Sequence, residues 1–261
     1  SKSLDDVYSV FHLAFINGTQ YFYSKPELVL EVGIKGTLNI LDCINKSKVE
    51  KFIFASSSEI YQSPNQIPTP EEVAGIVPDI KNPRYSYGGS KLIGEQLTIH
   101  YIKDNGLKKI IFRPHNIYGP SMGWEHVIPQ LVKKILFKLK ENNSNVIDLE
   151  IQGTGDETRS FCYIDDAVNA IILCNEKGLN NCIYNIGNVD EITIKNLIYS
   201  ISKILNLNIN IKPGKLQKGG TLRRCPNNDK IIKLGYKQRY TLQQGLKKTI
   251  EWYVNDLNQN Y

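Results

Sequence analysis

A tyrosine and a lysine stand four positions apart in the segment Tyr87-Gly-Gly-Ser-Lys91. Residues at i and i+4 of a helix project from the same face, so the Lys91 ammonium can lie near the Tyr87 phenol. A nearby cation favours phenolate and brings a phenol pKa that starts at about 10 toward the working range of a general base. Such a base can take the proton from a sugar or alcohol hydroxyl as hydride leaves the carbon. The same spacing also occurs in ordinary surface Tyr–Lys pairs.

Polar residues follow two apolar runs on either side of this segment. Residues 56–59 come directly after the run 51–55, and residues 113–120 come after the run 109–112. Both runs are continuously apolar, as buried strands of a parallel sheet are. Ligands bind at the carboxyl ends of such strands. We therefore expect hydroxyl, carboxylate and amide groups from these two segments to meet at one edge of a sheet.

Strands and helices alternate along the first half of the chain. The sequence predicts a strand at 7–13, a helix at 26–47, a second strand at 51–55, a helix from Tyr87 to about 104 and a third strand at 109–112. This rhythm predicts right-handed crossovers and an α/β fold with a doubly wound parallel sheet. After residue 119 the pattern is less regular. It predicts helices at 127–140, 166–176, 194–205 and 242–254, with short strands at 147–151 and 183–186.

Composition restricts the class of protein. The 261 residues are 41% apolar and 22% charged, which is a globular composition, and no apolar stretch could span a membrane. Five scattered cysteines form no C-x-x-C pair, which predicts reduced thiols in a cytosolic protein. The four histidines have no metal-ligand spacing, so no metal is expected. A net charge of +6, spread along the chain, suits a phosphate-bearing ligand, and nucleic-acid binding is not favoured.

The order of these segments resembles that of extended short-chain dehydrogenase/reductases of the NAD-dependent epimerase/dehydratase family, which act on nucleotide sugars. The resemblance covers nearly the whole chain and rests on Phe11-His12-Leu13-Ala14, Gly36-Thr37-Leu38-Asn39-Ile40-Leu41, the serine-rich segment 55–61, Tyr87 to Lys91, Asn116-Ile117-Tyr118-Gly119-Pro120, Thr158-Arg159-Ser160-Phe161 with Ile164-Asp165-Asp166, and Leu234-Gly235-Tyr236. It implies a Rossmann-like fold: residues 1–120 would form a partial NAD-binding domain. Residues 121–261 would be mainly a smaller mixed α/β substrate lobe, with some segments returning to the main sheet.

The resemblance also implies roles by position. The catalytic residues would be Ser57, Glu59, Tyr87 and Lys91. The cofactor NAD would contact Leu13, Ala14, Tyr87, Lys91 and Pro114, with Lys91 holding the nicotinamide ribose. The nucleotide diphosphate or base would be bound by Asn116, His126, Val127, Arg159 and Arg224. Arginine suits this work because its planar guanidinium can bind phosphate at two points.

Two positions bear on which activity the resemblance implies. Glu59 distinguishes between activities within the family, and Gly33 departs from the residue that the family usually has. Glu59 resembles the catalytic glutamate of family dehydratases and nucleotide-sugar decarboxylases, and a carboxylate there could also cap a loop or pair with a lysine. Dehydratases usually have an aspartate before it, whereas Ser58 here is a poor proton donor. Gly33 stands where the family usually has an asparagine that helps a proton relay, which a glycine cannot replace through a side chain.

Three functions are consistent with these residues. The first is a cytosolic, homodimeric, NAD-dependent nucleotide-sugar epimerase that acts through a transient keto-sugar. The second is a nucleotide-sugar decarboxylase or dehydratase that uses Glu59, and the third is a non-catalytic nucleotide- or RNA-binding protein on the same fold. No glycine-rich loop of the G-x-G-x-x-G type precedes Tyr87, and the chain opens in what looks like a mid-sheet strand. We therefore expect about two βα units of roughly 30 residues each to be missing, and residues 1–261 alone to bind NAD⁺ poorly.

Overall fold

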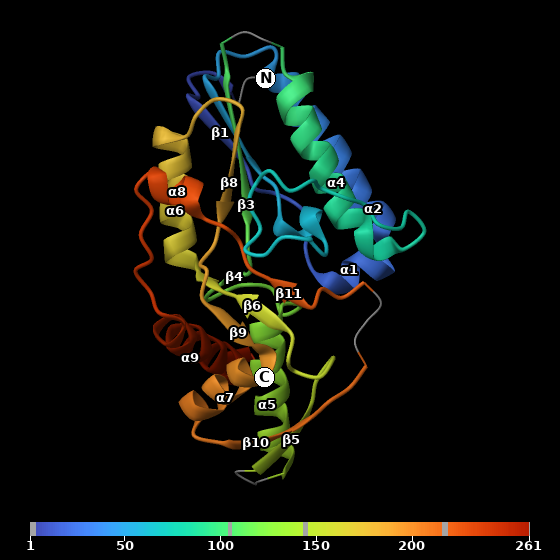
Figure 1. Cartoon of the computed structure of the whole chain (residues 1–261), viewed down its shortest axis with the longest axis vertical. Coiled ribbons are helices and arrows are strands. Elements are labelled where there is room, and N and C mark those ends of the chain that lie inside the picture. Colours follow the sequence, from blue (N-terminus) through green and yellow to red (C-terminus); the bar gives the residue numbers. More distant parts are fainter. Residues whose placement is uncertain (1–3, 104–105, 143–145, 216–218, 261) are drawn as a thin grey trace.

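A four-stranded parallel sheet lies at the centre of the upper half of the molecule (Figure 1). The computed structural model describes residues 4–103, 106–142, 146–215 and 219–260. The strand order is β1-β2-β3-β8, formed by Ser9–His12, Lys51–Ala55, Lys108–Pro114 and Cys182–Ile186. All three neighbouring pairs are parallel. The carboxyl ends of β1, β2 and β3 therefore lie at one edge, as the sequence predicts.

Helices cover both faces of this sheet, which confirms the predicted Rossmann-like arrangement (Figure 1). The alternating residues of β2 explain why both faces are apolar. Phe52 and Phe54 pack with one set of helices, whereas Ile53 and Ala55 pack with the other. One side carries α1 (Thr19–Ser24), α2 (Pro26–Leu30), the π-helical turn η2 (Glu31–Lys35), α3 (Gly36–Ile44), α4 (Ser86–Gln96) and the π-helical turn η5 (Leu97–Tyr101). The other side carries α6 (Ile164–Lys177) and α8 (Asp229–Lys233).

The lower half of the molecule has its own apolar core between helices and short strands. Three helices, α5 (Val127–Asn142), α7 (Ile194–Leu205) and α9 (Leu242–Asn260), pack against β5 (Val146–Glu150), which pairs with β10 (Asn208–Lys212). Short strands connect this half to the main sheet: β4 (Ile117–Tyr118) with β7 (Cys162–Tyr163), and β11 (Arg223–Arg224) with β6 (Thr158–Ser160) and β9 (Glu191–Thr193). The division into domains at residue 120 stays a prediction.

The structure corrects several predicted elements. The helix expected at 26–47 is divided into α2, η2 and α3, and α1 was not predicted at all. The strand predicted at 183–186 begins one residue earlier, at Cys182, and pairs with β3 in the main sheet. Helix α6 begins at Ile164, two residues before the predicted start, and the Asp166 carboxylate in its first turn accepts the backbone N–H groups of Arg239 and Tyr240.

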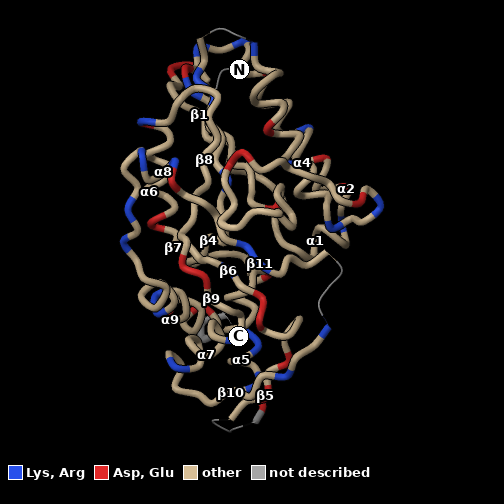
Figure 2. The backbone as a smooth tube through the Cα atoms, in the orientation of Figure 1, with Lys and Arg blue, Asp and Glu red and all other residues tan. Residues whose placement is uncertain are grey.

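Four general features concern the basic residues, the apolar helices, possible metal ligands and the cysteines. Lysine and arginine residues are distributed over the length of the molecule (Figure 2). Within the described residues, no helix is long and apolar enough to cross a membrane, and no group of His, Cys, Asp and Glu could hold a metal ion. All five cysteines are free thiols.

Candidate active site

Helix α4 carries Tyr87 and Lys91 on its buried face, one turn apart. Tyr87 is 6% exposed and Lys91 only 2%. The Lys91 Nζ donates a hydrogen bond to the carbonyl oxygen of Ala55, the last residue of β2, at 2.5 Å. It also lies 5.7 Å from the centroid of the Tyr87 ring. The helix thus brings the two side chains to the carboxyl edge of the sheet.

Two phenylalanines cover this pair. The Phe15 ring centroid lies 3.5 Å from Lys91 Nζ and meets the Tyr87 ring edge-on at 5.5 Å. The Phe22 ring stacks on Tyr87 at 4.6 Å with an interplanar angle of 11°. Neither phenylalanine was identified from the sequence, because apolar residues outside a motif give no sign of what they cover.

Burial changes the acid–base properties of both groups. It lowers the pKa of Lys91 to about 7, against the opposing effect of the Glu95 carboxylate. It raises the pKa of Tyr87, and a hydrogen bond from the Ser57 side chain only partly opposes that shift. The prediction that Lys91 lowers the pKa of Tyr87 is therefore wrong for this arrangement, because the ammonium is directed at the Ala55 carbonyl and the Phe15 ring.

Gly33 provides the space that Phe15 occupies. A Cβ atom at position 33 would lie 2.5 Å from Phe15 Cζ and 2.8 Å from Cε1, which is closer than non-bonded carbons approach. The Gly33 carbonyl accepts a hydrogen bond from Thr37 Oγ1 at 2.6 Å, and that hydroxyl also bonds the buried His12 ring. The glycine that replaces the family asparagine is thus the residue that allows Phe15 to rest on Lys91.

Ser57 and Glu59 begin the short helix η3 (Ser58–Tyr61) that follows β2. Ser57 is its N-cap, and its Oγ accepts the backbone N–H of Glu59 at 3.1 Å. The Glu59 carboxylate forms ion pairs with Arg84 at 2.8 Å and with Arg224 at 2.7 Å. Burial alone would raise the pKa of Glu59, but Arg224 and Arg84 outweigh it and lower that pKa to about 2. Glu59 is therefore ionised at neutral pH.

Arg84 is a site residue that the sequence did not reveal. It lies in the short helix η4 (Pro83–Tyr85), where the Asn82 side chain accepts its backbone N–H at 3.0 Å. Among the described residues, no hydrogen-bond partner faces Arg84 Nη1 or Arg224 Nε, although both atoms are buried. The only sequence signal was an arginine three positions before Tyr87, and no motif marked it.

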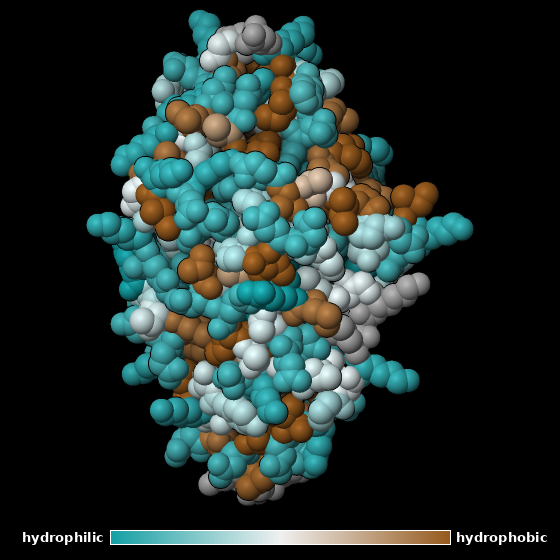
Figure 3. All heavy atoms as spheres, viewed as in Figure 1, coloured by the Kyte–Doolittle hydropathy of each residue, from teal (hydrophilic) through white to brown (hydrophobic). Residues whose placement is uncertain are grey.

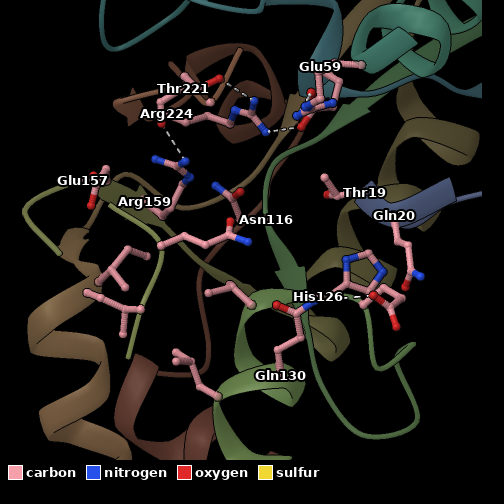
Figure 4. A pocket seen from close by; sticks show the side chains of 18 of the residues that line it. Thr19, Gln20, Glu59, Asn116, His126, Gln130, Glu157, Arg159, Thr221 and Arg224 are labelled. Carbon is pink, nitrogen blue, oxygen red and sulfur yellow. Dashed lines mark hydrogen bonds and ion pairs between the residues drawn. The ribbon is translucent and has the colours of Figure 1, made fainter. Parts of the chain in front are cut away.

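A cavity of about 730 Å³ opens between the two halves of the molecule (Figure 4). Glu59, Asn116, His126, Val127, Arg159 and Arg224 line it, so the structure brings together all five predicted substrate-binding residues. Its other described lining residues are Thr19, Gln20, Tyr23, Ser24, Arg84, Glu125, Gln130, Leu131, Lys134, Ile151, Gln152, Glu157, Ile194, Gly220 and Thr221. The described lining does not include Ser57, Tyr87 or Lys91.

Hydrogen bonds to the backbone hold the polar wall of the cavity in place. Arg159 donates from Nη1 to the Thr158 carbonyl and from Nη2 to the Thr221 carbonyl, each at 2.7 Å. Burial, helped by the charge of Arg224, lowers the pKa of Arg159 to about 10, so its guanidinium stays protonated at neutral pH. The Asn116 amide donates to the Ser160 carbonyl at 2.9 Å. The Arg159 guanidinium and the Asn116 amide both lie at the wall of this cavity (Figure 4).

The predicted cofactor contacts lie at the carboxyl edge of the sheet. Leu13 and Ala14 follow β1 and are exposed, and Pro114 ends β3. Beneath this edge is an ion pair that the sequence did not indicate: Arg113 binds both carboxylate oxygens of Glu95, at 2.8 and 2.7 Å. Because Ser56 also donates to Glu95, this carboxylate connects α4 with the end of β2.

The model of the NAD-dependent epimerase/dehydratase family matches residues 2–187, which is more than half of the chain. The chain belongs to this family. It is 32% identical over 256 residues to the UDP-N-acetyl-alpha-D-glucosaminuronate decarboxylase of Bacillus cytotoxicus, covering 94% of this chain and 76% of that protein.

Two solved structures show the same fold. The UDP-glucose 4-epimerase of Thermotoga maritima with UDP-glucose is 27% identical, with a TM-score of 0.82, covering 95% of this chain and 78% of that one. The UDP-glucuronic acid 4-epimerase of Bacillus cereus, with a fluorinated substrate analogue and NAD, is 25% identical, with a TM-score of 0.85, covering 97% and 77%.

The residues at the sheet edge fit the family cofactor, NAD, by the chemistry of their donors. An ammonium from Lys91, a phenol from Tyr87 and a hydroxyl from Ser57 lie together, and the exposed, apolar Leu13 follows β1 at the same edge of the sheet. These groups suit the ribose hydroxyls and the flat nicotinamide ring of such a cofactor. In this structure the Phe15 ring rests on the Lys91 ammonium, which also donates to the Ala55 carbonyl.

Proposed function

We propose that this protein is an NAD-dependent nucleotide-sugar epimerase that acts through a transient keto-sugar. The observation that carries the proposal is the placement of the Ser57 hydroxyl beside the buried Tyr87 phenol, next to Glu59, which lies at one end of a cavity lined by arginines. The guanidinium of Arg159 suits a diphosphate. The apolar side chains of Leu131 and Ile151 in the lining suit a nucleobase.

In this proposal, side chains of this protein carry out the proton transfer of the reaction. Tyr87 exchanges the proton of a sugar hydroxyl, and Ser57 keeps that hydroxyl within reach of the phenol. NAD, when bound, supplies the hydride acceptor. Because burial raises the pKa of Tyr87 in the present arrangement, the phenol becomes a competent base only when Phe15 leaves Lys91 and the ammonium can turn toward the phenol oxygen.

The state of Glu59 favours epimerisation over dehydration. Epimerisation at a carbinol carbon needs one proton-exchanging group and a hydride acceptor, whereas dehydration needs a further acid and base. Glu59 is held between two guanidinium groups with a pKa of about 2, so it cannot donate a proton at neutral pH. Ser58 beside it is no acid either. The proposal therefore gives Glu59 the role of orienting Arg84 and Arg224.

Decarboxylation of a sugar acid is the second candidate, and two observations support it. The buried Arg84 Nη1 and Arg224 Nε have no hydrogen-bond partner among the described residues, and both nitrogens could hold a sugar carboxylate. The 32% identity to a decarboxylase of a nucleotide-sugar acid also supports it. Loss of CO₂ would still require oxidation of the neighbouring carbinol, and therefore Tyr87.

Product analysis tests both candidates. The full-length protein is incubated with NAD⁺ and either UDP-glucose or UDP-glucuronate, and products are identified by NMR. Tyr87→Phe should reduce turnover by roughly 10²–10⁴-fold, which is the usual contribution of a general acid–base group. Tyr101→Phe, at the surface, serves as the control. Unchanged substrates, or equal rates in the Tyr87→Phe protein, would contradict the proposal, and release of CO₂ from UDP-glucuronate would favour the second candidate.

Two further proposals concern partners. A homodimer through α2 and α4 is supported by exposed apolar side chains there, such as Leu30 at 39% and Ile93 at 42%, and apolar residues gather over this region in Figure 3. Sedimentation velocity measures this state directly.

A non-catalytic RNA-binding role would instead require salt-dependent RNA retention without any nucleotide-sugar binding.

A further inference from the structure

Helix α1 forms one wall of the cavity with a single face. Thr19, Gln20, Tyr23 and Ser24 all line the cavity, and residues at these spacings lie on the same side of a helix. Phe22 lies on the opposite side of the helix, toward the protein interior, and is 2% exposed. The helix therefore has one polar side toward the ligand space and one apolar side toward the protein.

The apolar side fixes where the polar side stands. Phe22 stacks on Tyr87 at 4.6 Å, and the Arg84 guanidinium lies 5.3 Å from the Phe22 ring. The other end of the helix begins at Gly18, which has a φ of 121° that side chains rarely adopt, and whose Cβ would lie 3.4 Å from Glu125 Cβ. The stacking of Phe22 on Tyr87 thus anchors helix α1 beside the phenol, and the backbone at Gly18 leaves little space between the start of the helix and Glu125.

The polar side offers hydrogen-bonding groups to the cavity. Among the described residues, none hydrogen-bonds the Thr19 hydroxyl or the Gln20 amide, whereas the Ser24 hydroxyl donates to the Gln20 carbonyl at 2.9 Å. A hydroxyl and a carboxamide each donate and accept, so they match sugar hydroxyls, which do the same. Neither carries a charge that would select a phosphate.

The opposite wall has a different chemistry. Figure 4 shows Thr19 and Gln20 across the cavity from Arg159, with Asn116 between them. Guanidinium groups attract the anionic part of a ligand, so the uncharged wall is left for its uncharged part. In the proposed substrate that part is the sugar, because the diphosphate carries the charge.

We infer that Thr19 and Gln20 read the hydroxyl pattern of the sugar and so determine which nucleotide sugar this protein binds. The inference rests on the proposed function, since it assumes a nucleotide-sugar ligand. It assigns a role to the segment 17–24, whose residues belong to no catalytic motif. Because Phe22 lies on the reverse of the same helix, a sugar held by α1 is also held at a fixed distance from Tyr87.

Calorimetric titration with UDP, UDP-glucose and UDP-glucuronate tests the inference without requiring turnover. The variants are Thr19→Val and Gln20→Met, which remove polar atoms at nearly constant volume. The matched control is Tyr21→Phe, which removes a hydroxyl from the outer side of α1, where Tyr21 is 41% exposed. Each test variant should weaken UDP-sugar binding roughly two- to tenfold, as expected for one lost hydrogen bond. UDP affinity should be unchanged in all three.

The outcomes separate this inference from the proposed function. Unchanged UDP-sugar affinity in the Thr19→Val and Gln20→Met double variant would overturn the inference alone. An equal loss of affinity for UDP and for UDP-sugars would also overturn it, since α1 would then contact the nucleotide or support the whole cavity. A wild-type protein that binds none of the three ligands would count against the proposed function and the inference together.

Discussion

The contact between Gly33 and Phe15 predicts how a single methyl group should act on the candidate active site. In Gly33→Ala, the new Cβ would lie 2.5 Å from Phe15 Cζ, and the nearest atom of any other residue would be Ser90 Oγ at 3.1 Å. The Phe15 ring is the end of a side chain in an irregular segment, so we expect the ring to move rather than the helix. Its movement would remove it from the Lys91 ammonium and from the edge of Tyr87.

The size of the effect follows from what the ring loses. A cation–π contact with a desolvated ammonium contributes about 1–2 kcal/mol, and an edge-to-face aromatic pair about 0.5–1.5 kcal/mol. If the ring stays instead, overpacking costs a similar ~1–3 kcal/mol. Gly36→Ala is the matched control, because a Cβ there meets nothing within 4 Å. Relative to that control, Gly33→Ala should destabilise the protein by roughly 1–3 kcal/mol.

Urea denaturation of four proteins measures this effect: wild type, Gly33→Ala, Phe15→Ala and the double variant. The cost of Gly33→Ala should fall to that of Gly36→Ala once Phe15 is alanine, because the clash partner is gone. An amine-reactive reagent should also label Lys91 faster in Gly33→Ala than in wild type, read by peptide mass spectrometry. Additive free energies, or a Gly33→Ala protein as stable as the Gly36→Ala protein, would refute the reasoning.

Two pH-dependent predictions follow from the buried charges. The folded-state pKa of Glu59, about 2, lies below its ordinary 4.5, so its ion pairs stabilise the fold above pH 4.5 and that contribution is lost as the pH falls toward 2. Glu59→Gln should therefore cost about 3 kcal/mol at pH 7 by leaving Arg84 and Arg224 uncompensated, and should flatten the stability curve between pH 2 and 4.5 in urea denaturation. The folded-state pKa of Lys91, about 7, lies below its ordinary 10.5, so the unfolded chain binds the extra proton between these values and stability should rise with pH across that range. Lys91→Met should remove that rise, and an unchanged slope in the variant would contradict the assignment.

The parts of the fold that the sequence predicts well are those with a long local pattern. The strands β2 and β3 are continuous apolar runs and were predicted within two residues of their observed bounds. Helix α1 and the strands β6, β9 and β11 were missed for a shared reason. They are two to six residues long, and tertiary contacts stabilise them, such as Phe22 on Tyr87. A short segment has too little periodicity to reveal a contact made 65 residues away.

In the candidate site too, features that depend on local spacing were predicted, and features that depend on tertiary contacts were not. The spacing of Tyr87 and Lys91 correctly predicted a shared helix face, because it depends only on helix geometry. The predicted decrease in the pKa of Tyr87 was wrong, because that pKa depends on burial beneath Phe15 and Phe22. The ion pair from Glu59 to Arg224 spans 165 positions of the chain, so no local pattern could indicate it.

The charges around the cavity explain how three arginines can stand together before any ligand binds. Glu59 compensates Arg84 and Arg224 with one carboxylate. Arg159 donates its hydrogen bonds to backbone carbonyls, and the nearby Glu157 carboxylate acts on it through charge alone, because Glu157 accepts the backbone N–H groups of Thr154 and Gly155. The cluster therefore keeps an excess of positive charge in a fixed geometry. An incoming diphosphate need not displace a carboxylate from Arg159, so little of its binding energy is spent on rearrangement. A carboxylate paired directly with the Arg159 guanidinium would stabilise the empty cavity but compete with the phosphates, and for this reason carbonyl oxygens are the better hydrogen-bond partners there.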